Sequence, residues 1–163
     1  MTLNPFGRRS IVRAGPGDRV YHLWTESAAI EGTSLRGDPV ERVVITYQAP
    51  PVTGSDVEAY VQRFGEDYRE ILSANAPPRW PAVRSFLVDD QGRLWVGLSA
   101  PAGQPAEWVV LTGDGEYVGS VLLPGDTEIH SVRGERIAAV ATDEEDVPRI
   151  VLYRIALPSA GGP

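Results

Sequence analysis

Cysteine and lysine are both missing from the sequence, and only two histidines are present, His22 and His130. The absence of cysteine excludes disulfides, thiolate zinc sites, iron–sulfur clusters and a cysteine nucleophile. Two histidines are too few for a histidine-rich metal site, so no metal or other cofactor is expected. All 15 basic residues are arginines and 22 residues are acidic, which gives a formal net charge of -7. Without a dense cluster of cations to neutralise phosphates, the chain is not expected to bind nucleic acid.

Long apolar runs are missing as well. No stretch approaches the ~18 apolar residues that a membrane-spanning helix needs, and the amino-terminal MTLNPFGRRSIV lacks the apolar core of a secretory signal. Glycine and proline are abundant instead, with 17 and 14 copies in 163 residues, which favours many short strands joined by tight turns. A composition of 42% hydrophobic and 23% charged residues is typical of a globular domain.

Three segments share one pattern: a turn, then an arginine, then an apolar strand. They are GPGDRVYHL (15–23), DDQGRLWVGL (89–98) and VRGERIAAV (132–140), with Arg19, Arg93 and Arg136 as the shared arginine. The last two arginines are 43 residues apart, a usual length for one blade of a β-propeller. The first two are 74 residues apart, so an extra segment of about 31 residues is expected between the first and second repeats.

The extra segment is predicted to be a helix over residues 55–74, because apolar residues recur there with the period of one helix face. Thr53 and Ser55 compete as its N-cap, since each has an acidic residue three positions later, as in a capping box. Gly65 lies inside this window and costs about 1 kcal/mol relative to alanine. The helix is therefore expected to depend on packing against the rest of the protein.

Every other regular segment is expected to be an antiparallel strand. In the second repeat the predicted strands are residues 83–88, 93–98, 107–112 and 117–123. In the third repeat they are about 127–132, 135–142 and 148–156, and a fourth strand is missing. The pair Asp114-Gly115 is predicted to form a tight hairpin turn of the type that needs positive φ.

The segment PAVRSFLVDDQGRLWVGLSAPAGQPAEWVVLTGDGEYVGSVLLP (81–124) resembles bacterial six-bladed β-propeller proteins of the TolB-like or NHL type. The resemblance implies an all-β fold with one helical insert, in which three antiparallel four-stranded blades form part of a six-bladed propeller. The blades would span residues 1–50, 81–124 and 125–157, the last one incomplete, with the insert at 51–80 and a flexible tail at 158–163. The resemblance also implies an exported, extracytoplasmic protein, of which this chain is a carboxy-terminal portion.

No residue pattern predicts catalysis. The run DDQG (89–92) lacks the further acidic ligands of a calcium loop and is interpreted as a hairpin turn. Serine, histidine and aspartate occur without a G-x-S-x-G elbow, and His22 is expected to be a hydrogen-bonded residue of a strand. Packing roles are predicted for the tryptophans: Trp24, Trp95 and Trp108 between blades, and Trp80 between the insert and the blades.

The candidate site is an acidic face built from loops. In a propeller, the loops between second and third strands share a face with the connections between blades, which would gather residues 99–106, 124–128, 142–147 and the helical insert. The binding residues predicted there are Glu128, His130, Asp143, Glu144 and Asp146, with Asp126 and Glu145 beside them. His130 could instead line a central channel, and the acidic run could be an ordinary solvated loop. As a site, the face would suit a cationic ligand or partner.

The leading hypothesis is a non-catalytic ligand- or protein-binding propeller module within a larger exported protein. The alternative is a metal-dependent, lactonase-like hydrolase or lyase whose active site needs blades absent from this chain, and a third interpretation is an unrelated open antiparallel sheet with one helix. Three blades leave two exposed edges. A second copy could complete the ring as a homodimer, or a longer native chain could supply the missing blades. The longer chain is favoured because the amino terminus begins partway through the repeat pattern.

Overall fold

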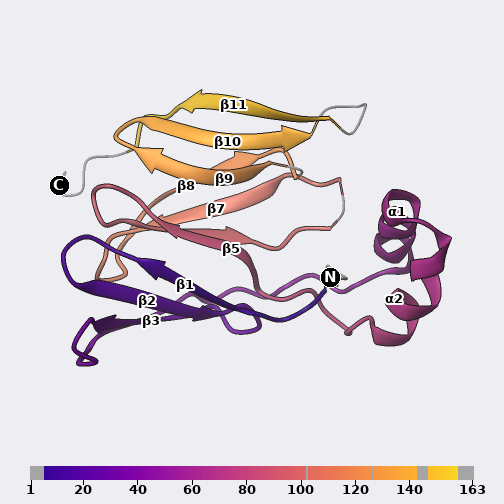
Figure 1. The fold of residues 1–163 in the computed structure, drawn as a ribbon, viewed down its shortest axis with the longest axis horizontal. Helices are drawn as coiled ribbons and strands as arrows, with labels where there is room; N and C mark the ends of the chain where they lie inside the picture. The colour runs from indigo at the N-terminus through magenta and orange to yellow at the C-terminus, as the bar shows by residue number, and fades with distance from the viewer. Residues whose placement is uncertain (1–5, 102, 126, 143–146, 158–163) are drawn as a thin grey trace.

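The computed structural model describes residues 6–101, 103–125, 127–142 and 147–157 (Figure 1). Within them the strands form three antiparallel sheets, and short helices lie beyond one end of the strands. The predicted mainly β fold with a helical insert is confirmed. In the described part of the chain, no helix is both long and apolar enough to cross a membrane.

In each sheet, strands that are adjacent in the sequence are paired. Sheet 1 consists of β1 (Ser10–Ala14), β2 (Arg19–Trp24), β3 (Ala29–Ser34) and β4 (Pro39–Val44). Sheet 2 consists of β5 (Val83–Val88), β6 (Leu94–Leu98), β7 (Ala106–Leu111) and β8 (Tyr117–Leu123). Sheet 3 consists of β9 (Glu128–Arg133), β10 (Arg136–Thr142) and β11 (Pro148–Arg154). The strands predicted for the second and third repeats agree with these bounds to within two residues. Within the described residues, sheet 3 has three strands.

Sheet 2 lies between the other two sheets, and the burial of its strands follows from that position. One apolar core joins sheets 1 and 2, and a second joins sheets 2 and 3. Every residue of β6 is buried because both of its faces are covered. In β2 only Tyr21 and Leu23 are buried, two residues apart, as expected for a strand with one covered face.

The three sheets share one orientation. In β2 and β6, the second residue after the repeated arginine packs against the following sheet: Tyr21 in the first core and Trp95 in the second. In β6 and β10, the residue directly after the arginine packs against the preceding sheet: Leu94 in the first core and Ile137 in the second. We call the side towards the following sheet the forward face and the opposite side the rear face. Both internal interfaces therefore join a forward face to a rear face.

Gly115 brings the turn between β7 and β8 close to sheet 1. It has a φ of 95°, as predicted for this hairpin turn, and its N–H donates to the Thr112 carbonyl. A Cβ atom added at Gly115 would lie 2.9 Å from Val43 of β4. Glycine is therefore required here both by the backbone conformation and by the close approach of the neighbouring sheet.

The helical insert is broken into two helices, so the prediction of one continuous helix over residues 55–74 is wrong. Helix α1 (Gly54–Phe64) ends at Gly65, where φ is 105°, a conformation that glycine tolerates and a helix excludes. A 3-10 turn, η1 (Glu66–Tyr68), leads into α2 (Arg69–Asn75). Thr53 is the observed N-cap, and its side chain forms a capping box with Asp56. The competing prediction of Ser55 as the cap is wrong.

A third apolar core packs the insert against the segments before β1 and after β4. Phe6, Val61, Leu72 and Trp80 are buried together in it, and the Phe6 and Trp80 rings meet edge to face at 4.9 Å. The predicted packing role of Trp80 is thus confirmed. The stability of these short helices comes from this core, because isolated helices of their length are marginal in water.

Candidate binding surface

The loops at the helical end of the sheets bond to one another. The Val83 N–H donates to the Thr25 carbonyl, and the Ser99 N–H donates to the Ala82 carbonyl. The Tyr47 hydroxyl, in the segment that leads into the insert, donates to the Ser99 carbonyl at 2.7 Å. We call this surface the loop end; it comprises the turn 25–28, the loop 99–105 without residue 102, the connections 124–125 and 127, and the insert. Residues 99–101, 103–106, 124, 125, 127 and 128 and the insert lie at this end, as predicted (Figure 1). Residues 143–146 of the remaining predicted loop lie outside the described residues.

The three sheets meet along β1, β5 and β9, each of which is the first strand of its sheet. These strands are sheet edges, and β1 contacts β5 while β5 contacts β9. Two arginines join them near the loop end. The Arg9 guanidinium donates to the Arg84 carbonyl, and the Arg84 guanidinium donates to the carbonyls of Gly125 and Thr127.

Arg84 reaches across because β5 carries a bulge between Val83 and Ser85. A bulge turns the extra residue out of the regular alternation of the strand. The repeat pattern of the sequence contains no signal for it. These arginines are consequently bound to backbone carbonyls and hold the sheets together.

The structure places two of the five predicted binding residues. Glu128 and His130 are both exposed on β9, the edge strand of sheet 3, and no hydrogen bond joins them in the described part of the chain. His130 lies where the register between β9 and β10 shifts, so a second bulge sets its position. Asp143, Glu144 and Asp146, and also Asp126 and Glu145, lie outside the described residues.

The DDQG run is a structural turn, as interpreted from the sequence. The carboxylate of Asp89 is fully buried, and it accepts hydrogen bonds from the backbone N–H groups of Gln91 and Arg93. It also accepts from Arg93 Nε at 2.6 Å and from Trp95 Nε1 at 2.9 Å. The exposed Asp90 accepts from the backbone N–H of Gly134 in sheet 3. Both carboxylates are thus occupied by bonds within and between the sheets.

The predicted roles of the strand residues are confirmed with one exception. His22 Nε2 lies 3.1 Å from the Ser10 hydroxyl, as expected for a hydrogen-bonded strand histidine. Trp95 and Trp108 are fully buried between sheets 2 and 3. The prediction that Trp24 fills a gap between blades is wrong for this chain, because it lies on the rear face of sheet 1 and is 39% exposed.

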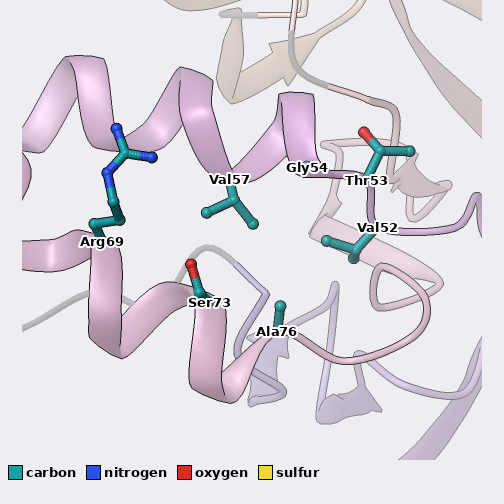
Figure 2. Close-up of a pocket in the computed structure, with 7 residues that line it drawn as sticks. All are labelled: Val52, Thr53, Gly54, Val57, Arg69, Ser73 and Ala76. Atoms are coloured by element: carbon teal, nitrogen blue, oxygen red, sulfur yellow. The ribbon is translucent and has the colours of Figure 1, made fainter.

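A pocket of about 370 Å³ opens between α1 and α2 at the loop end (Figure 2). Its apolar wall is formed by Val52, Val57 and Ala76, and hydroxyl groups come from Thr53 and Ser73. The pocket exists because the chain reverses at Gly65 and α2 returns along α1, a reversal that the helical period of the sequence does not reveal.

Arg69 lies beside this pocket, but its charge is already matched. It donates to Glu58 at 2.7 and 3.2 Å and to Glu66 at 2.7 and 2.9 Å. Hydrogen bonds from Arg69 lower the pKa of each glutamate, and hydrogen bonds to the two glutamates raise the pKa of Arg69. At the start of α1, Thr53 and Asp56 cap the helix. Because the Thr53 hydroxyl is bound to Asp56, the pocket offers apolar walls and the Ser73 hydroxyl rather than a free cation for an anionic ligand.

Within the described ranges, no group of three or more histidine or acidic side chains is placed to hold a metal ion. No protein-family model matches the sequence, and no curated protein matches it either.

Proposed function

We propose that this chain is a non-catalytic binding module, built as three blades of a six-bladed β-propeller. The repeated orientation of the sheets supports this architecture most strongly. Forward face packs on rear face at both internal interfaces, and the first strands β1, β5 and β9 lie side by side. Such an arrangement is typical of blades around a propeller axis. The resemblance of residues 81–124 to TolB-like and NHL-type propellers points to the same architecture.

The loop end is the surface that we propose for binding. Loops carried on a rigid scaffold are the usual place for binding residues, and here they are joined to one another by hydrogen bonds. The helical insert adds a pocket with apolar walls to this end. Glu128 is exposed at the start of β9, next to the loop end, and the chain has a net charge of -7. The partner expected from this chemistry is a cationic peptide or protein segment.

Titration with a nonalysine peptide, followed by calorimetry at low salt, tests the proposal. The test variant neutralises the acids predicted for the loop end: Glu128→Gln, Asp143→Asn, Glu144→Gln and Asp146→Asn. The control removes the same charge from turns at the opposite end of the sheets: Asp18→Asn, Asp38→Asn, Glu116→Gln and Glu135→Gln. We expect the test variant to bind roughly tenfold more weakly than the control, because each exposed charge pair contributes up to about 1 kcal/mol.

Equal weakening in both variants would contradict a binding surface at the loop end, because it would show a response to net charge alone. The non-catalytic part of the proposal has its own test. Hydrolysis of a lactone or ester by the wild-type protein, abolished in His130→Ala, would contradict it.

A further inference from the structure

Two sheet faces are left uncovered at the ends of the stack, and they are of opposite type. The rear face of sheet 1 has no sheet over it in the described chain, nor does the forward face of sheet 3. Each carries large apolar residues: Val12 and Trp24 on sheet 1, and Ile150 and Leu152 on sheet 3. The register of the strands allows three of these exposed residues, Val12, Ile150 and Leu152, to be compared with the residue at the equivalent position of the covered middle sheet.

On sheet 1, Val12 pairs with His22, three residues after the repeated arginine. Its equivalent in sheet 2 is Phe86, which pairs with Val96 at the same distance from Arg93. Val12 is 55% exposed, whereas Phe86 is 0% exposed beneath sheet 1. The position that is a core position in sheet 2 is therefore open to solvent in sheet 1.

The forward face of sheet 3 shows the same difference. Leu152 pairs with Ala138, two residues after Arg136, and its equivalent in sheet 2 is Val110, which pairs with Trp95. Leu152 is 72% exposed and Val110 is 0% exposed. Two residues before Leu152, Ile150 is 82% exposed, whereas its equivalent Trp108 is fully buried.

Although the sequence favoured further blades on a longer chain, the presence of one open face of each type on the same chain leads to a different proposal: we infer that a second copy of this chain covers both faces. The forward face of sheet 3 in one copy would pack on the rear face of sheet 1 in its partner, which repeats the arrangement already present at the two internal interfaces. Because each copy presents one face of each type, two copies can satisfy both ends. Such a head-to-tail contact forms a closed assembly when the rotation between subunits closes. The inference rests on the proposed six-bladed propeller, in which two three-bladed chains complete one ring.

The internal interface between sheets 1 and 2 shows which residues should meet. There the ring of Tyr21, on the forward face, lies against Phe86 on the rear face, with ring centroids 6.4 Å apart. The equivalent of Tyr21 in sheet 3 is Ala138, and the equivalent of Phe86 in sheet 1 is Val12. Ala138 of one copy should therefore lie close to Val12 of the other.

Sedimentation velocity over a range of protein concentrations tests this inference. We expect the wild-type protein to be a dimer, and Ile150→Asp to raise the dimer dissociation constant about tenfold or more, because it places an unpaired carboxylate in an apolar contact. Leu122→Asp is the matched control. Leu122 is an apolar strand residue exposed to a similar degree, 69%, but it lies on β8 of the middle sheet and away from both end faces. This variant should remain dimeric, and circular dichroism should show that both variants keep their β structure.

A wild-type monomer would overturn the inference, as would an open-ended series of larger assemblies or a fully dimeric Ile150→Asp variant. These results are separable from failure of the proposed binding function. A monomer that still binds the nonalysine peptide at the loop end overturns the pairing alone. A dimer that does not bind the peptide overturns the binding proposal alone.

Discussion

Replacing Asp89 with asparagine should destabilise the protein more than any conservative change at a neighbouring exposed residue. The buried carboxylate accepts four hydrogen bonds, two from backbone N–H groups and two from the side chains of Arg93 and Trp95. Asparagine is nearly isosteric but offers only one acceptor oxygen, so its amide N–H₂ group must face N–H donors. The substitution also leaves the guanidinium of Arg93, whose side chain is 14% exposed, without its counter-ion.

Breaking a buried ion pair by removing one partner costs about 3–5 kcal/mol, and we expect a loss of unfolding free energy in that range for Asp89→Asn. Asp90→Asn is the matched control, because Asp90 is exposed and an asparagine oxygen can still accept from the Gly134 N–H. It should cost less than about 1 kcal/mol. Urea unfolding followed by tryptophan fluorescence measures both values. If Asp89→Asn were within about 1 kcal/mol of wild type, the carboxylate could not be the group that holds this turn.

Three further perturbations have effects that follow from the contacts. Gly115→Ala should lower the free energy of unfolding by about 1–3 kcal/mol, because of the positive φ and the clash with Val43. Gly103 also has a positive φ but lies in open space, so Gly103→Ala should lower it less in the same urea assay. Thr53→Ala should cost about 1 kcal/mol by removing the cap of α1, and unchanged stability would contradict the cap. The glutamates that Arg69 binds have lowered pKa values in the folded state, so their contribution to stability is complete above the ordinary glutamate pKa and is lost as the pH falls below it. Arg69→Gln should therefore flatten the acid limb of a pH–stability curve, and an unchanged limb would contradict this ion pair.

The strands could be predicted from the sequence because each combines local alternation with a turn signal. The repeated arginines gave the common register, and the short third sheet followed from the missing fourth segment. The helical insert was harder, because Gly65 fits an apolar helical period yet takes a conformation that ends the helix. The choice between two overlapping capping boxes was likewise undecided by local sequence, since both fit the same pattern.

The site was less predictable than the fold. The turn chemistry of Asp89 could be interpreted correctly, but its bond to Trp95 depends on where the strand places the indole. The bulge at Arg84 and the fold-back of α2 are consequences of tertiary packing. Trp24 was expected in a core because its type and strand position match buried residues elsewhere. Sequence pattern identifies a residue that suits a covered face, but not whether another sheet of the same chain covers it.

Cross-linking between engineered cysteines tests most directly the claim that the two end faces complement each other. The chain has no cysteine, so Val12→Cys and Ala138→Cys each introduce a unique thiol, one on the rear face of sheet 1 and one on the forward face of sheet 3. With a short bismaleimide, a mixture of the two variants should yield a cross-linked dimer, whereas either variant alone should yield little. A chain carrying both cysteines should give a doubly linked dimer and no ladder of larger species. Equal cross-linking of either single variant with itself, or no cross-linking of the mixture, would contradict head-to-tail pairing of the end faces.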